Sequence, residues 1–79
     1  MHYVYTLESE AYPQRHYVGF TTDPERRSAE HNSGKSIHTN KFNPWKISTC
    51  FGFADKAKAT AFEKYLKSGS GRAFAKRHF

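Results

Sequence analysis

Two short runs of aromatic and β-branched residues near the start of the chain place the strongest constraint on its fold. Residues 2–8 (HYVYTLE) and 15–20 (RHYVGF) have the composition that is typical of β-strands. The polar segment between them contains Pro13 and suits a loop that turns the chain back. The two runs therefore predict a β-hairpin, and its connection, longer than a two-residue turn, leaves the register of the strands open.

Helix signals follow the hairpin directly. With Asp23 as N-cap, Pro24 takes the first helical position, where its missing N–H costs nothing. With Thr22 as the cap instead, Glu25 completes a capping box. Either start predicts a helix that runs to about His31 and ends at the Asn-Ser-Gly that follows.

This first helix is expected to be unusually polar. Besides the proline, Ala29 is its only apolar residue, so the helix has little to bury against a core. Arg27 and His31 are four residues apart and share one face. A solvated helix with weak surface ion pairs is the plain interpretation of this pattern, and a functional face is the alternative.

The second half of the chain predicts one strand and two helices. After a polar, irregular loop, the alternation over residues 45–53 (WKISTCFGF) predicts a third strand, with Gly52 as the place for a bulge. A helix is expected from residue 56 to about residue 67, with Asp55 as its cap. Its predicted apolar stripe comprises Ala57, Ala61, Phe62, Tyr65 and Leu66. Residues 68–71 (SGSG) are expected to break it, before a short helix or tail over residues 72–79.

The expected order is β-β-α-loop-β-α-α, in one domain that spans residues 1–79. A chain of 79 residues has room for a single core. No apolar run approaches the roughly 20 residues that cross a bilayer, and the N-terminus lacks a signal-peptide pattern, so we expect a soluble, cytoplasmic protein without membrane contact. Cys50 is the only cysteine, which excludes an internal disulfide and a cysteine-rich zinc site.

The charge balance indicates a polyanionic partner. Lys and Arg total 13 against 7 acidic residues, for a net charge of +6. Each cation that meets a phosphate releases a condensed counterion, which favours nucleic acid as the partner, whereas solubility alone is the other reason for such a charge. Aromatic residues make up 16% of the chain, and their rings either fill a small core or stack on bases.

Two tyrosine tripeptides lie on the paired strands, Tyr3-Val4-Tyr5 on the first and Tyr17-Val18-Gly19 on the second. Alternation places Tyr3 and Tyr5 on one face of the sheet, and Tyr17 can lie across from either. A cross-strand aromatic pair in the core would also explain them.

Two further positions are ambiguous from the residues alone. Glu63 follows Phe62, one step off the predicted stripe, and an ordinary surface pair with Lys67 at i+4 would account for it. His38, with Thr39 and Asn40, either approaches a functional site or is a solvated part of the loop.

Taken together, the two tripeptides resemble the GIY-YIG nuclease signature. The residues that continue the resemblance are 21–27 (TTDPERR), 31–32 (HN), 34 (G), 44–45 (PW) and 62–67 (FEKYLK). The chain looks most like the small single-domain members related to the N-terminal incision domain of the excision-repair nuclease. It departs from the family pattern at Tyr3, which replaces a glycine, and at Phe20, where some relatives carry a lysine.

The resemblance implies an α+β fold, in which a three-stranded antiparallel sheet is flanked by helices. It also implies that five side chains converge on one face of that sheet: Tyr5, Tyr17, Arg27, His31 and Glu63. This convergence would explain why the first helix is polar where a packed helix would be apolar.

The function implied is that of a metal-dependent endonuclease. Glu63 would hold one Mg²⁺ or Mn²⁺, and Arg27 would contact the scissile phosphate. Tyr5 or Tyr17 would take the proton of the attacking water; we favour Tyr5, oriented by His31, with Tyr17 bonding a metal-bound water. The expected substrate is nicked, flapped or branched DNA, and a non-catalytic nucleic-acid-binding module on the same fold is the alternative.

Basic residues are expected to form a rim around this site. Those that we expect to contact the DNA backbone are Lys35, Lys41, Lys64, Lys67, Arg72, Lys76 and Arg77. Such contacts would set affinity rather than sequence choice, and a scattered solvated surface is the alternative.

Overall fold

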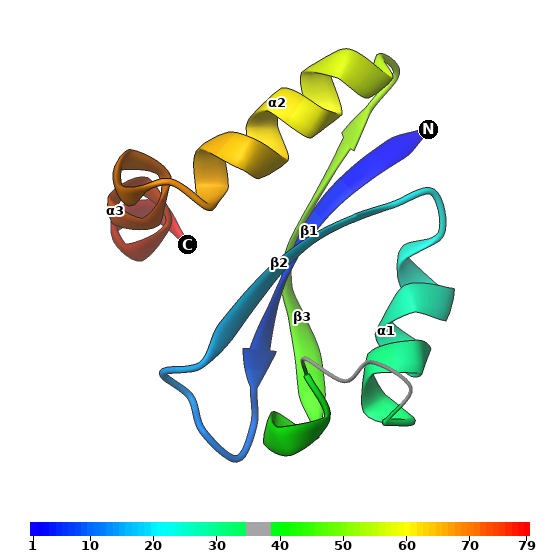
Figure 1. Ribbon diagram of the computed structural model, residues 1–79, viewed down its shortest axis with the longest axis vertical. Coiled ribbons are helices and arrows are strands. Elements are labelled where there is room, and N and C mark those ends of the chain that lie inside the picture. Colours follow the sequence, from blue (N-terminus) through cyan, green and yellow to red (C-terminus); the bar gives the residue numbers. More distant parts are fainter. Residues whose placement is uncertain (35–38) are drawn as a thin grey trace.

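A three-stranded antiparallel sheet forms the centre of the fold in the computed structural model, which describes residues 1–34 and 39–79 (Figure 1). Its strands are β1 (His2–Ser9), β2 (His16–Thr21) and β3 (Trp45–Phe53), in the order β2-β1-β3. The helices are α1 (Pro24–Asn32), α2 (Lys56–Leu66) and α3 (Gly69–His78), and a 3₁₀ turn at Asn40–Phe42 leads into β3. The predicted α+β fold and the order of its elements are confirmed.

The register of the hairpin brings the two tyrosine tripeptides together. Tyr5 of β1 pairs with Gly19 of β2, and Leu7 pairs with Tyr17. Paired residues project to the same face of a sheet, so Tyr5 and Tyr17 lie diagonally across from each other on one face.

The expected bulge lies elsewhere. Gly52 pairs regularly with Tyr3, and the irregularity falls where Thr6 pairs with Thr49 but Leu7 pairs with Ile47. At this point the backbone N–H of Thr49 donates to the hydroxyl of Thr6 at 3.1 Å. The Thr6 hydroxyl thus accepts a hydrogen bond from a backbone N–H that would donate to a backbone carbonyl in a regular ladder. As a result, β3 contains one extra residue at this point.

The sheet has one apolar cluster on each face. On the face covered by α2, Val4 packs with Ala59 and Leu66. On the face toward α1, Tyr5 packs with Leu7 and Trp45. Because β1 is the central strand, it supplies both clusters, and Tyr5 belongs to the core as well as to the candidate site.

The apolar stripe predicted on α2 is partly wrong. Ala57 and Ala61 are exposed and Tyr65 is 41% exposed, whereas Ala59 is fully buried. The buried face follows the positions 59, 62 and 66, which are spaced by three and four residues. Ala59, as a small residue, allows close approach to the sheet, and this sets the rotation of the helix. Glu63 lies four residues after Ala59 and therefore on the buried face.

The predicted break after α2 is confirmed, because α2 ends at Leu66, but the last helix begins at Gly69 rather than at residue 72, so the break is shorter than predicted. The hydroxyl of Ser68 accepts a hydrogen bond from the Gly71 backbone N–H at 3.1 Å and so caps the helix. A Cβ at Gly71 would clash with the carbonyl of Tyr65. The glycine therefore permits the tight turn between α2 and α3, rather than ending helical structure.

The structure also decides between Asp23 and Thr22 as the N-cap of α1. The Asp23 carboxylate accepts from the Arg26 backbone N–H at 3.1 Å, so Asp23 is the N-cap. The helix ends at Asn32, one residue later than expected. Within the described residues, no helix is both long and apolar enough to cross a membrane.

Candidate active site

Tyr5 is the centre of the candidate site. Its side chain is only 1% exposed, and its hydroxyl lies 3.0 Å from Nε2 of His31. A Cβ at Gly19, the cross-strand partner, would clash with the Tyr5 hydroxyl. Glycine at this position is therefore required by the path of the Tyr5 ring across β2.

His31 links Tyr5 to the loop before β3. It is fully buried on α1, and its Nδ1 lies 2.7 Å from the hydroxyl of Thr39. Thr39 is 1% exposed and its carbonyl accepts from Nε1 of Trp45 at 2.8 Å. Tyr5, His31 and Thr39 thus form a buried hydrogen-bonded chain whose far end is fixed by the core tryptophan.

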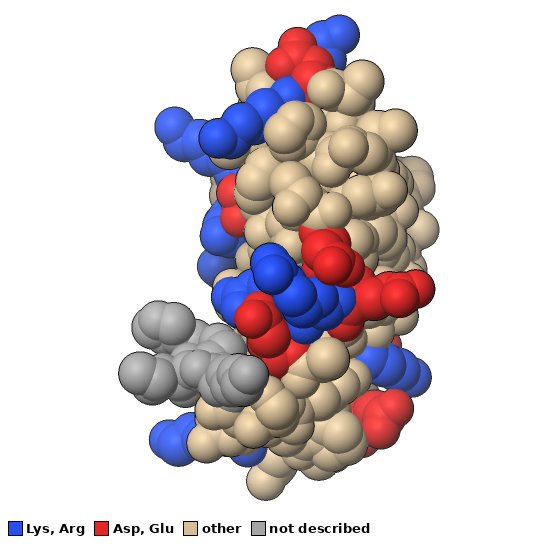
Figure 2. All heavy atoms as spheres, turned by 90° about the vertical axis from the view of Figure 1, so that its right-hand side faces the viewer, with Lys and Arg blue, Asp and Glu red and all other residues tan. Residues whose placement is uncertain are grey.

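Polar contacts, rather than apolar burial, attach α1 to the sheet. The side-chain amide of Asn32 donates to the Trp45 carbonyl at 2.9 Å and accepts from the Trp45 N–H at 2.6 Å. On the side of the molecule where α1 lies, acidic and basic side chains are interleaved at the surface (Figure 2). The helix is therefore solvated on one side and carries site residues on the other.

Of the other three predicted residues, Tyr17 shares a face of the sheet with Tyr5 and Arg27 lies on α1, whereas Glu63 lies on α2, which covers the opposite face. Tyr17 is partly buried, with its ring centroid 4.8 Å from that of His31 and 6.3 Å from that of Tyr5. The Arg27 guanidinium pairs with Glu30 at 3.1 Å. The Glu63 carboxylate, whose side chain is 20% exposed, pairs with the ammonium of Lys67 at 3.1 Å.

The electrostatics keep both Tyr5 and His31 neutral at pH 7. Burial, with a contribution from Tyr17, raises the pKa of Tyr5 to about 12, although the charge of Arg27 opposes the shift. Burial also lowers the pKa of His31, and the positive charge of Arg27 lowers it further. A neutral imidazole has one nitrogen that accepts and one that donates, so it can take the Tyr5 proton at Nε2 while Nδ1 donates to Thr39.

Arg27 remains charged under all relevant conditions. Burial alone would lower its pKa, but the hydrogen bond to Glu30 and the influence of Tyr5 outweigh burial, so the pKa of Arg27 is raised. The pKa of Tyr5 responds to the charges of Arg27 and Glu63. The two charged side chains are therefore within electrostatic reach of the same hydroxyl, with opposite signs.

At the candidate site, a divalent ion would have Glu63 as its single carboxylate ligand from the protein. The described residues contain no cluster of three or more His, Cys, Asp or Glu side chains that could hold a metal ion. Glu63 nevertheless fits Mg²⁺ or Mn²⁺, because such hard cations bind through one or two carboxylates and take waters and substrate phosphates as their other ligands. Its pair with Lys67, whose side chain is 54% exposed, is a surface pair that a cation can replace.

The basic residues predicted as a rim occur in two groups. Lys41 lies in the 3₁₀ turn, whereas Lys64, Lys67, Arg72, Lys76 and Arg77 lie on and between α2 and α3. Figure 1 shows α1 and α3 on opposite sides of the sheet. Lys35 and His38 fall outside the described residues.

Thr39 is the site residue that the sequence left undecided. The sequence left open whether its loop approaches the site or is solvated. In the structure Thr39 is buried and its hydroxyl is within hydrogen-bond distance of His31, so this part of the loop approaches the site. No periodicity marks a single threonine in a polar segment, and its contact with His31 depends on how the loop folds against Trp45.

Comparisons with known proteins identify the family of the chain. The sequence pattern described as the GIY-YIG catalytic domain matches residues 1–77. The chain is 42% identical over 66 residues to a UPF0213 protein of Streptococcus pneumoniae, covering 82% of this chain and 65% of that protein. It is 36% identical over 72 residues to a UPF0213 protein of Halalkalibacterium halodurans, covering 90% of this chain and 74% of the relative.

A longer relative has a more specific name. The chain is 37% identical over 65 residues to the structure-specific endonuclease subunit SLX1 homolog of Giardia intestinalis. The match covers 77% of this chain but 18% of that protein. The chain thus spans slightly less than two thirds of the streptococcal relative and less than a fifth of the Giardia protein.

Proposed function

The chain belongs to the GIY-YIG catalytic-domain family, and from this premise we propose that it is a metal-dependent endonuclease that hydrolyses phosphodiester bonds of DNA. One observation carries the proposal: Tyr17, Arg27, His31 and Glu63 all contact Tyr5 or shift its pKa. A base, a cation and a carboxylate around one hydroxyl supply the groups that phosphodiester cleavage needs.

The proposed substrate is DNA with a nick, flap or branch. The name of the Giardia relative supports structure selectivity. The basic composition, with a net charge of +6, supports a polyanion.

Tyr5 is the proposed acceptor of the proton from the attacking water. With a pKa of about 12, it holds its own proton at pH 7 and must release it as it accepts another. His31 Nε2, 3.0 Å away, takes that proton, and Thr39 supports the tautomer that allows it. Tyr17, which is the more exposed of the two tyrosines, positions the water.

Arg27, together with the divalent ion that Glu63 would hold, is proposed to neutralise the negative charge of the phosphate. The guanidinium of Arg27, oriented by Glu30, offers a planar fork to the phosphate oxygens. Mg²⁺ or Mn²⁺ would neutralise the phosphate and stabilise the leaving oxygen.

The proposal is tested by incubating the protein with nicked, flapped and branched DNA in Mg²⁺, Mn²⁺ or EDTA and measuring cleavage on gels. We expect metal-dependent cleavage by the unchanged chain and none by Glu63→Gln, with the same thermal unfolding midpoint for both. Glu25→Gln, which removes an exposed carboxylate from α1, is the matched control and should remain active. Full activity of Glu63→Gln would refute the assignment, whereas DNA binding without cleavage in any metal would identify a non-catalytic binding module.

A further inference from the structure

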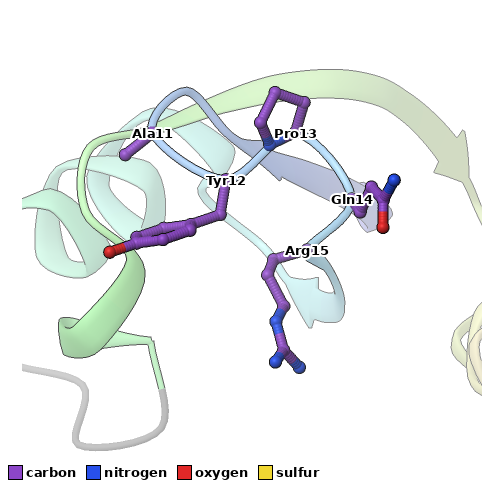
Figure 3. Close-up of a pocket in the computed structure, with 5 residues that line it drawn as sticks. All are labelled: Ala11, Tyr12, Pro13, Gln14 and Arg15. Atoms are coloured by element: carbon purple, nitrogen blue, oxygen red, sulfur yellow. The ribbon is translucent and has the colours of Figure 1, made fainter.

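The loop between β1 and β2 carries an exposed tyrosine and an exposed arginine, whose side chains extend from the loop in different directions in Figure 3. Tyr12 is 54% exposed, although its ring meets that of Phe42 edge-on at 5.5 Å between centroids. The guanidinium carbon of Arg15 lies 4.9 Å from the centroid of the same Phe42 ring. We call the surface formed by Tyr12 and Arg15 on Phe42 the loop ledge.

Hydrogen bonds fix the loop ledge in place. The buried hydroxyl of Ser9 donates to the Phe42 carbonyl at 2.7 Å and accepts from the Tyr12 N–H at 3.0 Å. The Arg15 N–H donates to the Tyr12 carbonyl at 2.8 Å. A ligand that binds here therefore meets side chains on an already ordered backbone, which reduces the entropy cost of binding.

The loop ledge and the candidate active site share one buried cluster. Phe42 and Tyr17 both pack against the buried cluster that contains Tyr5. Arg15 precedes Tyr17 by two residues, which corresponds to about 7 Å along an extended chain. A DNA strand that presents a phosphate near Tyr17 can therefore continue directly over the loop ledge.

From this arrangement we propose that the loop ledge binds an unpaired nucleotide next to the scissile phosphate, an inference that rests on the nuclease function proposed above. The exposed face of Tyr12 offers a stacking partner to any base, and Arg15 offers its charge to the neighbouring phosphate. Bases inside a continuous duplex are already stacked on both faces. The loop ledge therefore selects DNA with unpaired bases, such as a flap or a branch point, over uninterrupted duplex.

Fluorescence anisotropy tests this with a labelled single-stranded oligonucleotide and a duplex of the same sequence, both in EDTA. We expect Tyr12→Ala to weaken single-strand binding about tenfold and to leave duplex binding within about twofold. Tyr12→Phe keeps the ring and should bind as the unchanged chain does. Arg15→Met should weaken binding to both DNAs more than Lys58→Ala, which removes one exposed charge from α2, away from the loop ledge.

A second measurement keeps the inference testable if Tyr12→Ala does not fold. The unchanged chain is cross-linked by light to an oligonucleotide that carries 5-bromouracil at one unpaired position, and the modified peptide is identified by mass spectrometry. Cross-linking within the peptide that contains Tyr12 supports the inference, and cross-linking confined to other peptides overturns it.

Equal weakening of single-strand and duplex binding in Tyr12→Ala, or no weakening at all, would also overturn the inference. Neither measurement requires cleavage, so the two proposals can fail separately. Binding at the loop ledge without cleavage in any metal would refute the nuclease alone. Metal-dependent cleavage by the unchanged chain, together with unchanged single-strand binding in Tyr12→Ala, would refute the loop ledge alone.

Discussion

At the scale of single residues, the proposed proton path requires the tautomer of His31 in which Nδ1 carries the proton and donates to the hydroxyl of Thr39. If Nδ1 donates to Thr39, then Nε2 is free to accept from Tyr5. The hydrogen bond between Thr39 and Trp45 holds the loop in the position that makes this possible. Thr39 touches no substrate in this scheme, so it is a positioning residue.

We predict that Thr39→Val lowers kcat by roughly 10- to 100-fold and that Thr39→Ser restores most of the activity. Valine has a similar shape but neither accepts nor donates a hydrogen bond. Nitrogen-15 NMR of the imidazole is the decisive measurement, because it distinguishes the two neutral tautomers. In the unchanged chain Nδ1 should be the protonated nitrogen; protonation at Nε2 would contradict the scheme, whatever the activity of the variants.

His31 also makes the stability of the protein depend on pH. Its pKa is lowered in the folded state by burial and by Arg27, with Glu30 opposing; the hydroxyls of Tyr5 and Thr39 and the ring of Tyr17 also face the imidazole. Between the folded-state pKa of His31 and about pH 6.5, the unfolded chain binds a proton at this residue that the folded chain does not bind. Stability contributed by the neutral imidazole is therefore complete above that pH and declines as the pH falls through the folded-state pKa.

We accordingly expect the free energy of unfolding in urea to decrease between pH 7.5 and pH 5. The decrease should be smaller in His31→Gln, which cannot titrate. His16→Gln, at an exposed position of β2, is the control and should retain the full dependence. An identical pH dependence in all three proteins would show that His31 is not its source.

At the scale of elements, α1 is attached to β3 through one side chain. The two hydrogen bonds between Asn32 and the backbone of Trp45 replace the apolar contacts that this helix lacks. Arg27 and His31 are positioned by the same helix, so the attachment controls the geometry of the site as well as the stability of the fold.

We predict that Asn32→Ala destabilises the protein by about 2 kcal/mol and lowers activity by a larger factor than this destabilisation explains. The comparison is made under conditions where both proteins are fully folded, as shown by circular dichroism. Asn40→Ala removes an exposed side-chain hydrogen bond and should change neither quantity appreciably. Normal activity in a folded Asn32→Ala protein would show that α1 keeps its place without this contact.

The elements differ in how far the sequence determined them. The strands and the cap at Asp55 were predictable because alternation and capping are local properties, whereas the sequence left Asp23 and Thr22 as alternative caps of α1. The rotation of α2 about its axis was not predictable, because Ala57, Ala59 and Ala61 are equivalent in the sequence. Only packing against the sheet shows that Ala59 is the one in close contact. The start of α3 was not predictable either, since Gly71 is needed for a contact with the preceding helix that exists only in the folded chain.

The same distinction applies to the site. Tyr5, Tyr17, Arg27, His31 and Glu63 were identified from their resemblance to a family pattern, and their roles remain predictions. Residue types alone did not separate Glu63 from an ordinary surface carboxylate. Its place on the buried face of α2 depends on the rotation of that helix.

At the scale of the whole molecule, the charges proposed to bind DNA and the charge proposed to act in catalysis lie on different elements. Arg72 and Lys76 are exposed on α3, on the opposite side of the sheet from α1, which carries Arg27 (Figure 1). Lys67 serves this comparison poorly, because its ammonium pairs with the carboxylate proposed to hold the metal.

We predict that neutralising Arg72 and Lys76 together weakens DNA binding and flattens its salt dependence. The slope should fall by about 0.9 for each phosphate that the protein no longer neutralises, while single-turnover cleavage at saturating protein stays nearly unchanged. Arg27→Ala should show the reverse, with a large reduction of cleavage and a modest reduction of binding. Titrations over a range of salt concentrations and single-turnover assays measure both; similar behaviour of the two variants would mean that rim and centre are not distinct.

Tyr5 and His31 are among the most deeply buried side chains of the described structure, and this has a consequence for how such a domain can change over evolution. A substitution at either position alters the hydrophobic interior and the proposed proton path together. Selection for folding alone therefore also preserves the two residues of that path. Arg27 and Glu63 are only partly buried and carry no such protection. In relatives that no longer carry out the proposed cleavage, we therefore expect Arg27 and Glu63 to be substituted first. Tyr5 and His31 should persist in such relatives, because the fold still requires them.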